Sequence, residues 1–226
     1  MAVLFAPIVI AAALAALYIA VPQTYLDLIS EDSHIEDLQT VTFAAAGAMG
    51  LIAAWFALRA SAKLVTVLLA LFAIGCIVIA GEEVSWGQRF FGFETPESIA
   101  QRNKQNELTF HNLDGIQELT AVAYYVVCGF ACFAWIFIRN RDIPNRDVRR
   151  FVIPDWPTVT YFAPIALFYL LHDGLLYRGY ILSPLVESWR HQESFELLFA
   201  LGVAVVAFRN LRRARALDAP EPAVTT

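Results

Sequence analysis

Six apolar runs, each close to the length of a membrane-crossing helix, constrain this chain more than any other feature of its sequence. A helix needs about 20 mostly apolar residues to cross a hydrocarbon core about 30 Å thick. The runs cover residues 2–21, 38–58, 64–82, 116–138, 158–176 and 195–208. Charged residues make up 16% of the chain, whereas a soluble domain has about a quarter. The sequence therefore predicts an all-α, polytopic membrane helical bundle with about six transmembrane helices.

These helices are expected to form a single transmembrane domain over residues 1–215, followed by a flexible cytoplasmic tail over 216–226. The first run could be a secretory signal, but no Lys or Arg precedes it. Because a signal peptide begins with a basic segment, a retained helix is the favoured interpretation. The last run is short and depends on its flanks for length.

Basic residues are divided unequally between the two sets of connections. Eleven of the 16 Lys and Arg residues fall on the side that includes both termini, and five fall on the other side. Connections rich in Lys and Arg stay in the cytoplasm. Both termini are therefore predicted to be cytoplasmic.

Acidic residues have the opposite distribution, with 16 of the 21 on the non-cytoplasmic side. Such a face attracts cations rather than anions. The basic stretches are short juxtamembrane arms, which topology and anionic lipid headgroups explain. The bilayer is thus the expected partner, and nucleic acid is not.

The longest connection, residues 83–115, is expected to have structure of its own, because unstructured loops of this length are uncommon. Thr95-Pro96-Glu97 is typical of a helix start. We expect a short interfacial helix near 96–104 that lies on the bilayer. Ser33 with Glu36 has capping-box spacing, and Glu36, Glu118 and Glu196 are interpreted mainly as helix caps.

The pair Glu82-Glu83 closes the third run and is the first candidate site. Two adjacent carboxylates at the membrane boundary repel each other and would hold a proton, an Arg or a metal ion. If the helix continues, Glu82, Ser85, Trp86 and Arg89 share one face. Ser85, Trp86, Gln88 and Arg89 are candidate substrate-binding residues. The alternative is an interfacial anchor, with Trp86 in the aromatic belt and Arg89 reaching the headgroups.

The pair His172-Asp173 is the second candidate, because ionisable residues inside an apolar run usually face the bundle interior and serve a function. Asp173 would orient His172 or act as a base. A structural tie between two helices is the alternative interpretation. Gly174 could also break the helix and leave the pair in a re-entrant turn.

The segment Asn106-Glu107-x3-His111-Asn112 is the third candidate. Glu107 and His111 would point the same way on a helix, and Asn106 and Asn112 are candidate substrate-binding residues. His with Glu or Asp suits zinc, manganese or iron. The hypothetical metal ligands are listed together as Glu82, Glu83, His111 and His172. The compact HExxH signature is missing from the sequence.

The run Glu82-Glu83-x-Ser85-Trp86-Gly87-Gln88-Arg89-x-Phe91-Gly92, with the Thr95 and Asn106 motifs after it, resembles a pattern in a bacterial family of multi-pass membrane proteins. No activity has been assigned to that family. The resemblance covers about residues 31–120 and implies that these motifs belong together. It also implies a bacterial inner (plasma) membrane as the location.

Three functions are compatible with these patterns. The first is a membrane-embedded hydrolase or transferase of a lipid-type substrate, with Glu82, Glu83, His172 and Asp173 as catalytic residues and a divalent metal such as zinc. The second is an accessory or scaffold subunit that binds a membrane-protein partner. The third is a proton or cation transport protein, although most of the apolar runs lack charge in their central turns.

Overall fold

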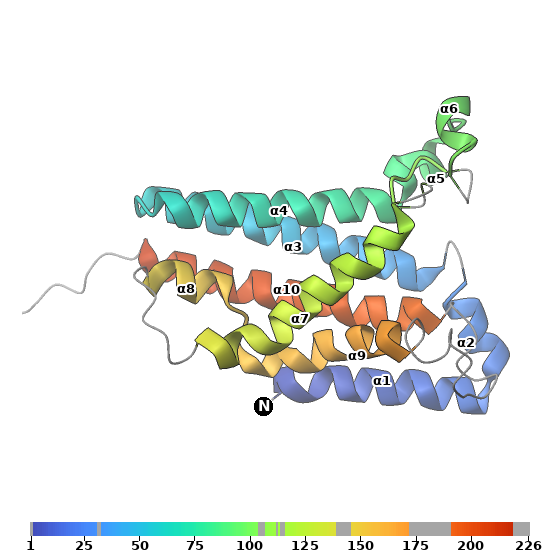
Figure 1. Cartoon of the computed structure of the whole chain (residues 1–226), viewed down its shortest axis with the longest axis horizontal. Helices are drawn as coiled ribbons and strands as arrows, with labels where there is room; N and C mark the ends of the chain where they lie inside the picture. Colours follow the sequence, from blue (N-terminus) through green and yellow to red (C-terminus); the bar gives the residue numbers. More distant parts are fainter. Residues whose placement is uncertain are drawn as a thin grey trace, which may run out of the picture.

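The computed structural model shows a bundle of long helices, most of which run along the long axis of the molecule (Figure 1). The residues that it describes are 2–30, 33–103, 107–111, 113, 116–138, 146–171 and 191–218. Four predicted site residues lie outside these ranges, namely Asn106, Asn112, His172 and Asp173. The side chain of Arg89 also lies outside the described part, as do residues 219–226 of the predicted tail.

Every secondary-structure element named among the described residues is an α-helix or a 3-10 helix, which confirms the all-α prediction. The longer helices are α1 Ala2–Ala20, α3 His34–Arg59, α4 Lys63–Glu83, α7 Gln117–Ile138, α9 Val159–Tyr169 and α10 Gln192–Leu217. The shorter helices are α2 Pro22–Leu28, α5 Gln88–Phe91, α6 Glu97–Ala100 and α8 Arg146–Val152. Two 3-10 turns, η1 Ser85–Gly87 and η2 Trp156–Thr158, complete the described elements.

Four of these helices, α1, α3, α4 and α10, are long and apolar enough to cross a membrane. Helix α7 has a shorter apolar stretch over Val122–Ile138, and α9 has 11 residues. The helices support a membrane protein, while the count of six spans stays a prediction. Helix α10 has 26 residues because it extends beyond both ends of the predicted run. Helix α6 falls within the expected 96–104, and its seat on the bilayer stays a prediction.

Helix α3 lies at the centre of the packing, between α4 and α10, while α9 packs against α7 and α10. Small residues allow α3 and α4 to approach closely. A Cβ added at Gly47 would lie 2.8 Å from Ile77 Cγ1, and one at Gly50 would lie 2.9 Å from Ala73 Cβ. Gly and Ala on facing surfaces are the usual means by which membrane helices pack at short range.

The two ends of the bundle seen in Figure 1 differ in the charged residues of their helices. The carboxylate end contains the end of α4, helices α5 and α6, and the starts of α3 and α10. The arginine end contains α8, the start of α4 and the end of α10. An apolar core separates them, with buried side chains that include Phe43, Cys128, Phe162, Ile165 and Ala200.

The capping-box prediction is wrong at Ser33. Its side chain makes no capping hydrogen bond, and its buried Oγ has no partner among the described residues. Instead the Ser33 backbone oxygen accepts the Asp37 N–H at 3.1 Å. Glu36 still lies in the first turn of α3, where a negative charge complements the helix dipole. Glu196 is the fifth residue of α10 and therefore lies past the positions that a cap serves.

Candidate functional site at the carboxylate end

The EExSWG motif ends helix α4 instead of continuing it, which corrects the expectation of one shared helical face. Helix α4 stops at Glu83, and the next turn contains three residues with positive φ: Ser85 at 47°, Trp86 at 54° and Gly87 at 88°. Only glycine adopts this conformation without a steric cost, so Ser85 and Trp86 are strained. Such strain persists only where surrounding contacts enforce it.

The strained turn folds the Trp86 ring back onto the last turn of α4. A Cβ added at Gly81 would lie 3.0 Å from Trp86 Cε3, so the missing side chain makes room for the indole. Trp86 Nε1–H then donates a hydrogen bond to Glu82 Oε1 at 2.5 Å. The Trp86 side chain therefore has a structural partner, and part of its surface remains exposed.

Glu82 is held by donors on both of its oxygens. Its Oε2 accepts the backbone N–H of Phe110 at 2.7 Å and that of His111 at 3.1 Å. The His111 ring Nδ1 lies 3.1 Å from the same oxygen. With Trp86 on Oε1, this carboxylate fastens the 107–111 segment to the end of α4. Glu82 and His111, two of the four hypothetical metal ligands, are thus in contact in the structure.

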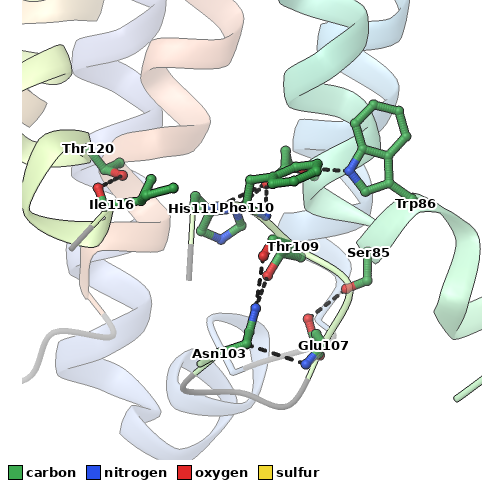
Figure 2. A network of polar contacts seen from close by, with 10 residues as sticks. Ser85, Trp86, Asn103, Glu107, Thr109, Phe110, His111, Ile116 and Thr120 are labelled. Atoms are coloured by element: carbon green, nitrogen blue, oxygen red, sulfur yellow. Dashed lines mark hydrogen bonds and ion pairs between the residues drawn. The ribbon is translucent and has the colours of Figure 1, made fainter. Parts of the chain in front are cut away.

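Other side chains of the motif hold the same loop, and Figure 2 shows the contact between Ser85 and Glu107. Ser85 Oγ–H donates to Glu107 Oε2 at 2.6 Å. Gln88 Nε2 donates to Thr95 Oγ1, and Gln88 Oε1 accepts the Leu108 N–H, both at 2.8 Å. These contacts make Ser85 and Gln88 parts of a loop framework, in addition to their predicted role in substrate binding.

Residues 107–111 are not helical, so the geometry expected for a shared ion between Glu107 and His111 is not present. Glu107 binds Ser85, whereas His111 binds Glu82. Asn103 closes the loop from inside by donating from Nδ2 to the Thr109 backbone oxygen at 2.8 Å and to its Oγ1 at 3.1 Å. The i,i+4 rule failed here because loop contacts, rather than a helix, set the side-chain directions.

A second carboxylate centre lies inside the bundle on α10. We call Glu196, Gln192, Tyr169 and Tyr124 the Glu196 cluster. The Glu196 side chain is 8% exposed, and its Oε1 accepts Gln192 Nε2–H at 2.6 Å and the Tyr169 hydroxyl at 3.4 Å. Tyr124 also hydrogen-bonds to Glu196 and stacks on Tyr169 with 5.1 Å between ring centroids.

Gln39 of α3 extends this polar interior toward the start of α10. Its side chain is fully buried, and Nε2 donates to the Glu193 backbone oxygen at 2.9 Å and to Glu193 Oε2 at 3.3 Å. The Gln39 Oε1 atom is buried and has no hydrogen-bond partner among the described residues. A buried acceptor without a donor is costly, so this end of the bundle has unused capacity for a proton donor or a cation.

The two acids of α10, Glu193 and Glu196, also interact electrostatically with charged groups outside α10. Glu193 is repelled by Glu196, Glu36 and Glu83. Glu196 gains a favourable interaction with His111. Buried carboxylates that repel one another need bound protons or a cation to lower their energy. Glu83, one of the predicted catalytic residues, therefore acts on the same interior electrostatic site as the α10 acids.

Tyr25 on α2 ties the start of α10 to the N-terminal helices. Its hydroxyl lies 2.9 Å from His191 Nδ1 and 3.0 Å from Ser194 Oγ. Burial raises the pKa of the Tyr25 hydroxyl, and its hydrogen bond with Ser194 opposes that shift. His191 also lies edge-on to Tyr18. These contacts fix the position of the α10 start, on which Glu193 and Glu196 depend.

Sequence reasoning did not select Glu193, Glu196, Gln39, Tyr124 or Tyr169 as site residues. One signal was present, since Gln39 lies within an apolar run and Glu193 and Glu196 lie one turn apart at the entry of another. Among the described residues, no group of three or more His, Cys, Asp or Glu side chains is placed to hold a metal ion. His172 and Asp173 lie outside that search.

No protein-family model, no curated protein and no solved structure matches this chain. The resemblance of the EExSWGQR segment to a bacterial membrane-protein family therefore stays a prediction.

Proposed function

We propose that this chain is an integral membrane protein that hydrolyses or transfers part of a lipid-type substrate at its carboxylate end. Glu196 would be the acid–base group, and Tyr169 and Tyr124 would orient it. Glu83 and Glu193 would set the negative potential that attracts a cation. A divalent metal such as zinc would supply Lewis-acid chemistry there.

The observation that carries this proposal is the placement of Glu196. Glu196 is 8% exposed, accepts hydrogen bonds from a tyrosine and a glutamine and interacts with other acids. Burying such a carboxylate costs free energy, and ionisable residues kept inside a membrane bundle usually serve a function. Titratable groups with different partners in one buried cluster are typical of general acid–base sites. Glu82, by contrast, is proposed to position the covering loop rather than to react.

Transport is the less supported alternative, because the described residues between the two ends form an apolar core. A proton or cation would need polar groups along that path. The polar residues instead gather at one end of the bundle, where we propose that a lipid headgroup reaches them.

The test is turnover by the purified chain in nanodiscs, with a panel of glycerolipids and sphingolipids and with products measured by mass spectrometry. Glu196→Gln is expected to lower the rate at least about 100-fold, the usual contribution of a general acid or base. Glu97→Gln, an exposed carboxylate on α6, is the matched control and should keep the wild-type rate. Chelation should abolish turnover, and zinc should restore it. Product formation by Glu196→Gln at the wild-type rate would contradict the proposal.

An accessory role is the second candidate, and the exposed aromatic side chains of the loop favour it. Phe90 is 70% exposed, Phe91 81% and Phe110 57%, beside the loop contacts that hold them in place. Such a surface suits a partner helix or the headgroup layer. Copurification of a stoichiometric membrane partner, lost in Phe90→Ser/Phe91→Ser and retained in Glu196→Gln, would favour this function over catalysis.

A further inference from the structure

The arginine end contains a cavity of about 750 Å³, which is large enough for a lipid headgroup and the adjoining glycerol. Helix α8, which contributes to its lining, lies at the opposite end of the bundle from the start of α10 (Figure 1). Helices α7, α8 and α10 and the turn before α9 all contribute to its wall. The lining residues are Trp135, Ile138, Arg146, Arg149, Arg150, Ile153, Pro154, Asp155, Trp156 and Arg213.

The charge of this cavity is positive. Four arginines line it, and Asp155 is the one acidic residue among its described lining side chains. Asp155 Oδ2 already accepts Arg209 Nη1 and Arg213 Nη2, each at 2.7 Å. These two guanidinium groups satisfy Asp155, so it does little to neutralise Arg146 and Arg150, whose side chains are exposed. Arginine favours phosphate because its planar guanidinium can donate two parallel hydrogen bonds.

The wall that holds these arginines is fixed by contacts between α8 and α10. Arg213 Nη1 donates to the Arg150 backbone oxygen at 2.6 Å, and Asn210 Nδ2 donates to the Phe151 backbone oxygen at 3.0 Å. Phe151 is buried in the core cluster that contains Leu211 and Ala214. Helix α8 is therefore docked before any ligand binds, which reduces the ordering cost of binding.

Most of the remaining lining is apolar. Trp135 and Ile138 of α7 line the cavity together with Ile153, Pro154 and Trp156, which follow α8, and Trp156 is 54% exposed. The Trp135 indole N–H has no acceptor among the described residues. A basic pocket with apolar side chains in its wall matches an amphiphile that has a negative head and hydrocarbon chains.

We propose that this cavity binds an anionic phospholipid, with the phosphate on Arg146 and Arg150 and the start of the acyl chains against the apolar side chains of the cavity wall. The chemistry shared with a free phosphate compound is the phosphate group. The apolar lining favours the lipid. This inference is independent of the proposed catalytic function, because the two sites have no residue in common and lie at opposite ends.

The experiment is native mass spectrometry of the detergent-purified full chain, titrated with phosphatidylglycerol, phosphatidylcholine, glycerol phosphate or inorganic phosphate. Phosphatidylglycerol should bind, and phosphatidylcholine should bind much more weakly. Arg146→Gln/Arg150→Gln should weaken phosphatidylglycerol binding about 30-fold, at roughly fivefold per arginine. Circular dichroism checks that the variant is folded, and Arg146→Lys/Arg150→Lys, which keeps both charges, should recover part of the binding.

The matched control is Arg59→Gln/Arg212→Gln, which removes two charges at the same end from residues that do not line the cavity. It should keep the wild-type affinity. An equal loss in this control would overturn the proposal, because binding would then follow the general surface charge. Displacement of the lipid by glycerol phosphate or inorganic phosphate at similar concentrations would overturn it too, since the ligand would then be a soluble phosphate.

Discussion

Glu82 and Glu196 are both largely buried carboxylates at the same end of the bundle, and their surroundings are opposite in character. Glu82 has a tryptophan, two backbone N–H groups and a histidine around its two oxygens. Glu196 also has donors, from Gln192, Tyr169 and Tyr124, but it repels the neighbouring acid Glu193, which has the same sign of charge. The surroundings of Glu82 stabilise its negative charge, whereas those of Glu196 do so less because of the repulsion from Glu193. We therefore interpret Glu82 as a residue that stabilises the fold and Glu196 as a residue that is kept for function.

Removal of the Glu82 carboxylate should produce the largest loss of stability. In Glu82→Ala, four hydrogen-bond donors lose their acceptor at once, and we expect a cost of about 3 kcal/mol. Thermal unfolding in detergent, followed by circular dichroism, measures the effect. Glu94→Ala, an exposed acid in the following loop, should change stability little. A melting temperature for Glu82→Ala equal to that of this control would show that the loop is not held by Glu82.

Filling the space over Gly81, where the Trp86 ring packs, should give the next largest loss of stability. In Gly81→Ala the new methyl group would contact the Trp86 ring at about 3.0 Å, which forces the indole away from Glu82. We expect a loss of about 2 kcal/mol and a shift in tryptophan fluorescence. Gly75→Ala is the matched control on the same helix, because its added Cβ meets nothing within 4 Å. That control should be neutral or slightly more stable, since Ala favours a helix over Gly.

The apolar runs predicted the α-helical fold and the position of α4, whose observed start and end each lie within one residue of the predicted 64–82. They also placed Glu82 and His111 at one end. The turn at Ser85 and Trp86 could not be read from periodicity, because it depends on a ring filling the space over Gly81. The burial of Glu196 depends on Tyr124 and Tyr169, which are far away in sequence. Pattern rules describe one helix at a time and so assigned Glu196 a local capping role.

Gln88 offers a smaller test of the loop framework. Gln88→Ala removes its bonds to Thr95 and to the Leu108 N–H, and we expect a loss of about 1 to 2 kcal/mol. Protease sensitivity of the 88–111 segment should rise in parallel. Gln101→Ala, which removes one exposed contact with Glu97, is the control and should leave both measurements unchanged. Equal sensitivity of the two variants would remove Gln88 from the framework.

The most direct measurement of the contrast between the two acids is the thermal unfolding of Glu82→Gln and Glu196→Gln, recorded side by side near neutral pH. Both substitutions remove one negative charge and keep the side-chain size. We predict that Glu82→Gln lowers the melting temperature, because its carboxylate is surrounded by donors. We predict that Glu196→Gln leaves it unchanged or raises it, because repulsion from Glu193 is relieved. A fall of similar size in both variants would contradict the account, since Glu196 would then be a structural support like Glu82.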